Sequence, residues 1–268
     1  MRAPGRDHRR PSAARQGDEG RFVAKPARAV VNKGDVVLVT GASAGIGKAT
    51  AELLAKRGYR VICAARRLDR IRALAKRIGG HALHLDLADA ESCARLLKRL
   101  PPAWRKIAVL VNNAGSDTGG RVPFENWANA DFEQTVDVNL TGLMRATKAV
   151  LPAMRGRGQI VNIGSQAGRA PYKGASAYAA TKAAVHVFGQ VLRMELADRG
   201  IKVTNILPGL VQTEFAQVRY RGDAAKAAAF YAEYKTKMKP EDIARAVLYA
   251  LDQPERVTIA ELLIVPSS

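Results

Sequence analysis

The sequence has few cysteines, no long apolar run and no histidines at metal-ligand spacing, and each absence narrows the possible functions. Its two cysteines, Cys63 and Cys93, lie far apart in a chain of 268 residues and form no C-x-x-C pair, which argues against a disulfide framework or a zinc site. No apolar run approaches the ~20 residues that a membrane-spanning helix needs. No metal site and no membrane partner are therefore predicted. Two separate thiols fit a reducing compartment, and we expect a cytoplasmic protein.

Acidic residues are also scarce, with 24 Asp and Glu against 43 Lys and Arg and a formal charge of +19. Residues 1–33 are basic and show little apolar periodicity, so we expect a disordered arm there, followed by one folded domain over residues 34–268. The other basic residues are scattered and accompany no nucleic-acid-binding signature, so no specific nucleic acid partner is predicted. Nucleic-acid binding or organelle targeting through the arm stay open as alternatives.

A glycine-rich turn follows the first apolar run of the domain. Residues 36–39 predict a buried strand, residues 40–47 read T-G-A-S-A-G-I-G, and helix-forming residues continue to 57. Gly41 permits the tight turn, Gly45 lets the backbone approach a pyrophosphate, and Gly47 lets helix and strand pack closely. Because the helix N-terminus would face the anion, this arrangement predicts a dinucleotide site.

Two arginines end the second predicted strand, which covers residues 60–65. A dinucleotide site that takes NAD usually has an acidic residue near this point, which holds the ribose hydroxyls. Here Arg66 and Arg67 follow Ala65 instead. Because guanidinium groups can bind a 2′-phosphate with paired hydrogen bonds, we predict NADP(H) as the cofactor. The alternative is that the two arginines only open the following helix.

Further apolar runs alternate with helical patterns along the rest of the domain. We predict strands at residues 81–86, 107–111, 159–164, 201–207 and 257–265. The repeating order of strand and helix indicates a single doubly wound, Rossmann-type α/β domain with a mainly parallel sheet and right-handed crossovers. Asp86, at the end of the third strand, is placed to bind an adenine amine, or it caps the helix that begins near Asp89.

The segment S-A-Y-A-A-T-K, residues 176–182, carries the predicted chemistry. In a helix, Tyr178 and Lys182 lie one turn apart on the same face. A nearby ammonium group favours the phenolate and lowers the pKa of a tyrosine, which makes the phenol usable as a general acid and base. Ser165 stands at the end of a predicted strand, where its hydroxyl opens into the ligand crevice of such sheets.

Taken together, T-G-x-x-x-G-I-G, N-N-A-G at residues 112–115, Ser165 and Y-x-x-x-K resemble the short-chain dehydrogenase/reductase family, and the match covers residues 35 to about 266. The resemblance implies a catalytic tetrad in which Asn139 anchors a water in a proton relay towards Lys182. Ser165 would hold the substrate oxygen, Tyr178 would be the general acid/base, and Lys182 would bind the nicotinamide ribose. It also implies a homodimer or homotetramer formed through the long helices around Asn139 and Tyr178.

The same resemblance and the motifs above give a set of expected cofactor contacts. They come from the glycine turn, the ends of the strands, the catalytic helix and the P-G-L-V-Q-T segment. The set is Gly41, Ser43, Gly45, Ile46, Gly47, Arg66, Arg67, Asp86, Leu87, Asn113, Ala114, Gly115, Tyr178, Lys182, Pro208, Gly209, Val211 and Thr213.

One branch of the family is especially similar, namely the NADP-dependent 3-hydroxy acid dehydrogenases, also called serine 3-dehydrogenases. The likeness lies in T-E-F-A-Q-V-R-Y-R-G-D, L-P-P-A-W and E-L-L-I-V-P. It implies oxidation of a small 3-hydroxy acid such as serine or 3-hydroxypropionate, with Ser165, Tyr178 and Arg219 as substrate contacts. Arg219 is either the carboxylate contact or a surface arginine on a mobile lid. Ala44, where many NADP-using relatives have a basic residue, and the loop 116–129 depart from the pattern.

Two other functions remain compatible with the sequence. The first is a reductase of the same fold that acts on a bulkier ketone, aldehyde or secondary-metabolite intermediate, because the fold does not fix the substrate. The second is a regulator that binds NADP without catalysis, although such a protein would be expected to lack the Tyr or the Lys.

Overall fold

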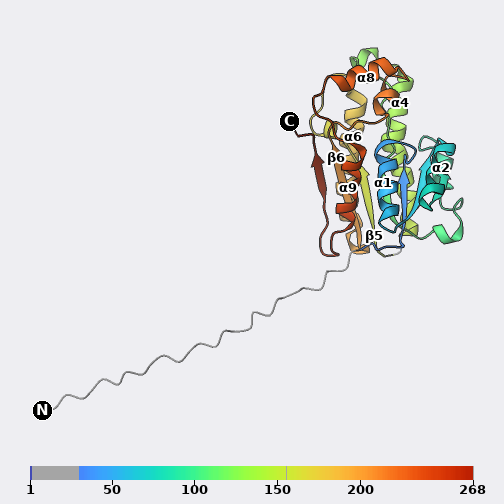
Figure 1. Ribbon diagram of the computed structural model, residues 1–268, viewed down its shortest axis with the longest axis vertical. Coiled ribbons are helices and arrows are strands. Elements are labelled where there is room, and N and C mark those ends of the chain that lie inside the picture. Colours follow the sequence, from blue (N-terminus) through green and yellow to red (C-terminus); the bar gives the residue numbers. More distant parts are fainter. Residues whose placement is uncertain (2–29, 155, 268) are drawn as a thin grey trace.

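The computed structural model describes Met1, residues 30–154 and residues 156–267. A seven-stranded parallel sheet forms its centre, with strand order β3-β2-β1-β4-β5-β6-β7. The predicted doubly wound α/β class is thereby confirmed, and the arrows in Figure 1 all rise towards the same upper edge. The strands are β1 (Val36–Thr40), β2 (Arg60–Ala65), β3 (His81–His84), β4 (Ile107–Asn112), β5 (Gly158–Ile163), β6 (Ile201–Pro208) and β7 (Glu261–Ile264).

Helices cover both faces of the sheet. One face packs against α1, α2 and α9 through a core that includes Leu54, Ile71 and Leu251, while the other packs against α3, α5 and α6 through Leu96, Val150 and Leu192. The short helices α7 and α8 lie above the carboxyl edge (Figure 1). The helices are α1 (Gly45–Lys56), α2 (Leu68–Ile78), α3 (Ala90–Ala94), α4 (Asn129–Val136), α5 (Gly142–Val150), α6 (Ser176–Glu195), α7 (Phe215–Arg219), α8 (Ala224–Ala232) and α9 (Pro240–Leu251).

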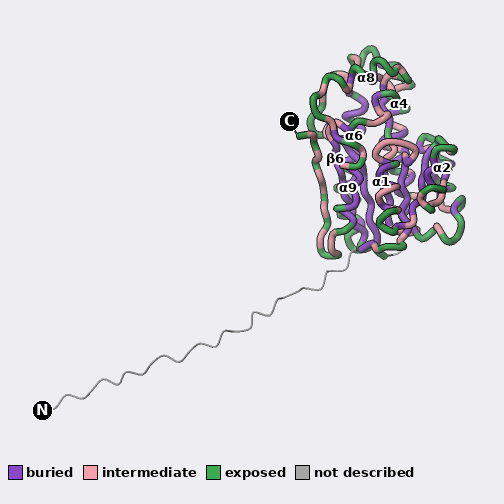
Figure 2. Tube along the Cα trace, in the orientation of Figure 1, coloured by how far each residue is buried: buried purple, intermediate pink, exposed green. Residues whose placement is uncertain are grey.

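The central strands are buried along their whole length, as the purple core in Figure 2 shows. A parallel strand with helices on both faces has no solvent-facing side, so its sequence reads as a continuous apolar run rather than an alternating one. The run V-V-L-V-T of β1 follows this rule, whereas β5, G-Q-I-V-N-I, also buries Gln159 and Asn162, whose amides form hydrogen bonds inside the core. The central strands were predictable because their apolar runs are short and alternate with longer helical patterns.

Several predicted boundaries change in the structure. Val30 and Val31 fall inside the expected arm, yet both are buried in the core beneath α1 and α9, because their apolar side chains pack there. The folded unit therefore begins by Val30 rather than at residue 34, whereas the arm prediction for residues 2–29 lies outside the described residues. The third strand ends at His84 instead of residue 86, and the last strand covers only Glu261–Ile264.

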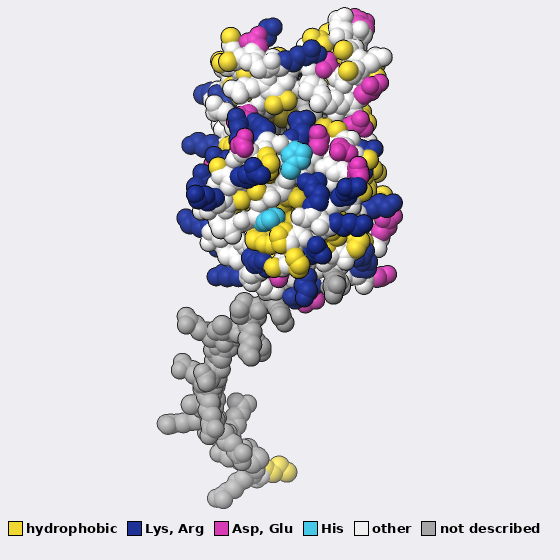
Figure 3. Space-filling model, turned by 90° about the vertical axis from the view of Figure 1, so that its right-hand side faces the viewer, with side chains coloured by type: hydrophobic (Ala, Val, Ile, Leu, Met, Phe, Trp, Pro, Cys, Tyr) yellow, Lys and Arg dark blue, Asp and Glu magenta, His cyan; other side chains and the backbone are white. Residues whose placement is uncertain are grey.

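Lys and Arg side chains are scattered over the face seen in Figure 3 and interleaved with acidic ones. This view shows no single basic groove on that face. None of the helices in the described part of the chain is long and apolar enough to cross a membrane.

Candidate active site

A cavity of about 640 Å³ opens at the carboxyl edge of the sheet, where the strand order turns from β1 to β4. Ligands bind at this switch point in open α/β sheets. Of the predicted site residues, only Gly47 and Asn139 do not line it. The predicted residues on its wall are Gly41, Ser43, Gly45, Ile46, Arg66, Arg67, Asp86, Leu87, Asn113, Ala114, Gly115, Ser165, Tyr178, Lys182, Pro208, Gly209, Val211, Thr213 and Arg219.

The glycine turn joins β1 to α1 at one end of the cavity. Gly41 has a φ of +67°, and a Cβ atom there would lie 2.8 Å from the Cα atom of Ala114. A Cβ atom at Gly47 would lie 2.5 Å from the carbonyl oxygen of Gly41, so this residue serves the close packing of helix on turn. No side chain of residues 30–154 or 156–267 caps the N-terminus of α1, and its first turn holds no acidic residue. The site can therefore accept an anion such as a pyrophosphate.

Thr40 ties this turn to the N-N-A-G segment, a role that the sequence analysis missed. Its hydroxyl accepts hydrogen bonds from the backbone N–H groups of Asn113 (2.9 Å) and Ala114 (3.0 Å). The side-chain amide of Asn113 donates in return to the carbonyl oxygen of Thr40 at 2.9 Å. These bonds join the ends of β1 and β4 at the base of the cavity. Thr40 precedes the glycines directly, which is the only sequence signal for its role.

Arg66 and Arg67 both line the cavity but differ in their surroundings. The guanidinium group of Arg67 donates to the hydroxyl of Ser43 at 2.9 and 3.0 Å and to the carboxylate of Glu214 at 2.7 Å. Arg70 donates to the same carboxylate at 2.8 Å. Partial burial works against ionisation of Glu214, yet hydrogen bonds from Arg67 and Arg70 hold its pKa below the usual value. The side chain of Arg66 is exposed at the rim.

Asp86 faces the cavity, and of its two predicted roles, that of the helix cap belongs to Asp89 instead. Asp89 caps α3, since its side chain accepts a hydrogen bond from the N–H group of Glu91 at 2.8 Å. Asp86 accepts from the N–H group of Ala88 at 3.1 Å within the same turn. Its carboxylate therefore helps to shape the rim without capping the helix.

Ser165, Tyr178 and Lys182 meet on one wall of the cavity, although 17 positions of sequence separate the first from the last. Ser165 follows β5, and the other two lie one turn apart on α6. All three are buried, and the amine of Lys182 lies 5.8 Å from the centre of the Tyr178 ring. The hydroxyl of Ser165 accepts a hydrogen bond from the N–H group of Ala167 at 3.1 Å, which leaves its own proton free to donate.

The pKa of Tyr178 differs from the sequence-based expectation. Burial raises the pKa of Tyr178 to about 12, and a hydrogen bond to Ser165 lowers it only in part. Burial also lowers the pKa of Lys182 to about 8, and its amine donates to the carbonyl oxygen of Ile163 at 2.8 Å. The structure does not show the expected lowering of the tyrosine pKa by Lys182: burial sets the pKa of Tyr178, and the groups that lower it are Ser165 and Arg219. Tyr178 is a neutral phenol at pH 7.

Asn139 lies in a π-helical turn, Asp137–Thr141, between α4 and α5. Its amide oxygen accepts from the N–H group of Ser116 at 2.7 Å, and its amide nitrogen donates to Ser116 at 2.9 Å and to Thr181 at 3.2 Å. These bonds occupy both ends of the side chain. Asn139 thus fixes the strand-end loop that carries Ser116 to the catalytic helix that carries Thr181.

Comparisons with known proteins show which family this chain belongs to. The family model described as short chain dehydrogenase matches residues 35–224. A NADP-dependent 3-hydroxy acid dehydrogenase, YdfG of Salmonella typhi, is 42% identical over 236 residues, which cover 86% of this chain and 94% of the relative. The chain belongs to the short chain dehydrogenase family.

Two further proteins are similar to the chain over most of its length. Sulfoacetaldehyde reductase 2 of Chromohalobacter salexigens is 37% identical over 240 residues, covering 87% of this chain and 94% of the relative. The solved closed form of serine dehydrogenase complexed with NADP+ has a TM-score of 0.82 and 39% identity, and the match covers 85% of this chain and 94% of that one.

His186 supports Ser165 in this short chain dehydrogenase, and the sequence analysis missed it. Its Nε2 atom accepts a hydrogen bond from the backbone N–H group of Ser165 at 3.3 Å. Burial lowers its pKa to about 4, and the charges of Lys182 and Arg169 act in the same direction. The ring therefore stays neutral and can accept. The only sequence signal for this role of His186 is its position on α6, one turn beyond Lys182.

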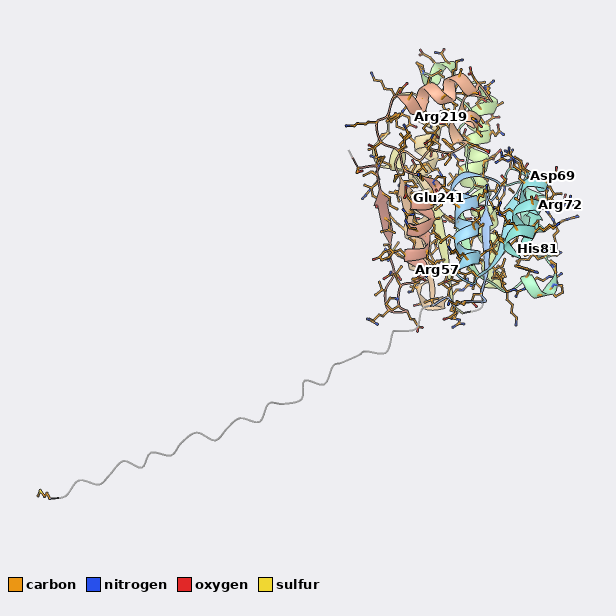
Figure 4. All side chains as sticks on the ribbon, in the orientation of Figure 1. Arg57, Asp69, Arg72, His81, Arg219 and Glu241 are labelled. Carbon is orange, nitrogen blue, oxygen red and sulfur yellow. The ribbon has the colours of Figure 1, made fainter. Side chains whose placement is uncertain are left out.

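Arg219 is not a surface arginine, so one of its two predicted settings is wrong. It is 4% exposed and lies in the upper part of the molecule in Figure 4. Its guanidinium group donates to the carboxylate of Asp117 at 2.7 Å and to the hydroxyl of Tyr172 at 3.0 Å. Burial raises the pKa of Asp117, whereas the charge and hydrogen bond of Arg219 lower it. The pair anchors α7 to the loop after β4.

Proposed function

We propose that this short chain dehydrogenase catalyses reversible hydride transfer between NADP(H) and the alcohol or carbonyl carbon of a small 3-hydroxy acid, such as serine or 3-hydroxypropionate. The observation that carries the proposal is the meeting of Ser165, Tyr178 and Lys182 in the cavity that also holds the glycine turn. The names of the relatives, a 3-hydroxy acid dehydrogenase and a serine dehydrogenase, support the substrate class.

The residues around the turn fit NADP(H). The uncapped N-terminus of α1 would hold the pyrophosphate, and Arg66 and Arg67 would bind the 2′-phosphate, where an acidic residue would repel it. Asp86 would bind the adenine, while Asn113, Gly115 and the segment 208–213 would hold the nicotinamide half. Lys182 would bind the nicotinamide ribose. When bound, the cofactor supplies or takes up the hydride.

The protein's own groups move the proton. A neutral phenol at Tyr178 can donate its proton to a carbonyl oxygen as negative charge develops there, which is the step that carbonyl reduction needs. The free proton of the Ser165 hydroxyl would hold the same oxygen. Lys182, with a pKa of about 8, is suited to return a proton towards Tyr178 near neutral pH. Asn139 would keep this relay in place by fixing the Ser116 loop to α6.

The Tyr178→Phe variant tests this function. We expect its turnover to fall by roughly 10²-fold or more, because the proton donor is removed while the ring remains. The assay follows NADPH or NADH absorbance with serine, 3-hydroxypropionate and several aldehydes. Tyr249→Phe on α9 is the matched control, since Tyr249 is 53% exposed and lies outside the cavity. Wild-type turnover by Tyr178→Phe would overturn the assignment.

A bulkier carbonyl substrate is the second candidate. Aromatic side chains crowd the substrate end of the cavity and offer a large apolar wall, which a small acid would not need. The same absorbance assay with cyclic and aromatic ketones separates the two candidates. The aromatic residues on this wall are Tyr172, Phe215, Phe230, Tyr231 and Tyr234.

We also propose that the enzyme is a cytoplasmic homodimer or homotetramer. Met144 of α5 and Val187, Val191 and Met194 of α6 are exposed apolar side chains on helices of the same sheet face, and a second copy could cover them. The two cysteines are free and buried, which fits a reducing compartment. Sedimentation velocity measures the assembly, and cell fractionation tests the location.

A further inference from the structure

Two arginine side chains line the substrate end of the cavity, Arg219 from α7 and Arg121 from the loop after β4. They lie against a common ring, because the guanidinium carbons of Arg219 and Arg121 are 5.3 and 5.0 Å from the centre of Phe230. A substrate anion in this part of the cavity would therefore meet one of them. Their surroundings decide which one has charge to offer.

The charge of Arg219 is already compensated inside the protein. Its partner Asp117 is 1% exposed and accepts from the guanidinium group at 2.7 Å. Two such buried groups form a neutral pair, and a second carboxylate would have to compete with Asp117 at close range. Tyr172 accepts a further hydrogen bond from Arg219. This arginine is thus committed to holding α7 in place.

The charge of Arg121 is compensated less, because it acts on Asp117 more weakly than Arg219 does and forms no hydrogen bond with it. Its nearest carboxylate oxygen, on Glu233, is 3.9 Å away, and the Glu233 side chain is 64% exposed to screening solvent. Its guanidinium carbon lies 4.6 Å from the centre of the Tyr172 ring, and one nitrogen donates to the hydroxyl of Tyr234 at 3.2 Å. The Nε atom is buried and has no hydrogen-bond partner among the described residues. Arg121 therefore retains charge, and since its Nε atom is closed off from solvent, the terminal nitrogens are the ones that an anion can reach.

We propose that Arg121, rather than Arg219, binds the anionic end of the substrate, a carboxylate or a sulfonate. The inference rests on the proposed function, since it assigns an anion contact within that same site. Guanidinium groups bind planar carboxylates with paired hydrogen bonds, and aromatic rings on its flanks fix the orientation of the group. The Arg219–Asp117 pair then positions the wall of the cavity. The loop 116–129, which departs from the branch pattern, carries both Asp117 and Arg121.

The first test compares an acid with an uncharged analogue of similar size, such as 3-hydroxypropionate and its amide. In Arg121→Gln we expect kcat/KM for the acid to fall about tenfold or more, mainly through KM, with the amide changed less than about twofold. Arg121→Lys should recover part of the acid turnover. Arg95→Gln at the C-terminal end of α3 is the control, because Arg95 is exposed and, within the described part of the chain, pairs only with Glu91. Equal losses on both substrates would overturn the inference.

The second test replaces the buried pair together, as Asp117→Asn with Arg219→Gln, so that no unpaired charge remains. The ratio of acid to amide kcat/KM should stay near the wild-type value even if both rates fall, and thermal melting checks folding. A collapse of this ratio would assign the anion to Arg219 and overturn the inference.

A third measurement separates this inference from the proposed substrate. Propionate should inhibit aldehyde reduction competitively in the wild-type enzyme and about tenfold more weakly in Arg121→Gln. If no hydroxy acid is turned over but propionate inhibits in this way, the proposed substrate fails and the anion site stands. If propionate inhibits both enzymes equally, or neither, the anion site at Arg121 is wrong.

Discussion

Single buried side chains in this protein hold the proposed catalytic residues in place. His186 accepts a hydrogen bond from the backbone N–H group of Ser165. Its ring also packs against Gly164 and Gly168, where added Cβ atoms would lie 2.5 and 2.6 Å from the ring. A protonated ring could not accept that hydrogen bond at Nε2. The position of Ser165 therefore depends on the neutral state of a histidine that touches no substrate.

The titration of His186 gives the first prediction at this scale. Its pKa of about 4 lies below the ordinary 6.5, so the unfolded chain binds a proton between these values while the folded chain does not. This group's contribution to stability is complete above about pH 6.5 and is lost as the pH falls towards 4. His186→Gln can still accept a hydrogen bond but cannot titrate.

We expect the melting temperature of His186→Gln to fall less than that of the wild type between pH 6.5 and 4.5, and kcat to fall less over the same range. Lys182 does not interfere, because its pKa of about 8 affects stability only at alkaline pH. Parallel curves for the two proteins would contradict the assigned role.

Among the elements, the segment between β6 and α7 connects the two ends of the cavity. Glu214, just before α7, pairs with Arg67 at the end of β2 and with Arg70 of α2, while its neighbours Thr213 and Phe215 line the wall near the catalytic group. These ion pairs are exposed by about two fifths to one half, so their contribution to stability is at most about 1 kcal/mol. Their effect on an incoming anion is larger, since Glu214 occupies the guanidinium group proposed for the 2′-phosphate.

Removal of this carboxylate should strengthen binding of the phosphorylated cofactor. In Glu214→Gln we expect the Kd for NADPH to fall severalfold, while the Kd for NADH and the melting temperature change little, because only the 2′-phosphate competes for Arg67. Fluorescence titration with both cofactors measures this difference. Glu241→Gln, an equal change of charge outside the cavity, is the control. A weaker NADPH complex would show that Glu214 orients Arg67 instead.

At the scale of the whole molecule, the sequence predicted what depends on local order and missed what depends on distant partners. The buried strands, the glycine turn and the Tyr178–Lys182 spacing are each visible within a short window. The pairing of Arg219 with Asp117 spans 102 positions and that of Glu214 with Arg67 spans 147, so no local pattern could reveal them. The high pKa of Tyr178 was missed for the same reason, because burial is a property of the assembled cavity.

The edge of the folded unit is another result of long-range packing and gives a stability prediction. Val31 is 2% exposed in the core beneath α1 and α9. Val31→Ala should lower the free energy of unfolding by about 2 kcal/mol, because buried methyl groups and their packing are lost. Val218→Ala, at a site 41% exposed, should lower it by less than about 0.5 kcal/mol. Urea denaturation of both variants measures the difference, and equal midpoints would place Val31 outside the cooperative fold.

The bridge from Glu214 to Arg67 and Arg70 has a kinetic meaning for catalysis. Arg67 and Glu214 line the cavity, and the next residue, Phe215, lies against the ring of Tyr178 with the ring centres 5.4 Å apart. A dinucleotide must break these ion pairs to place its 2′-phosphate against Arg67, whereas a small acid needs only the space that remains beside Tyr178. Opening of these ion pairs should therefore slow the entry and exit of the nucleotide but not those of the small acid.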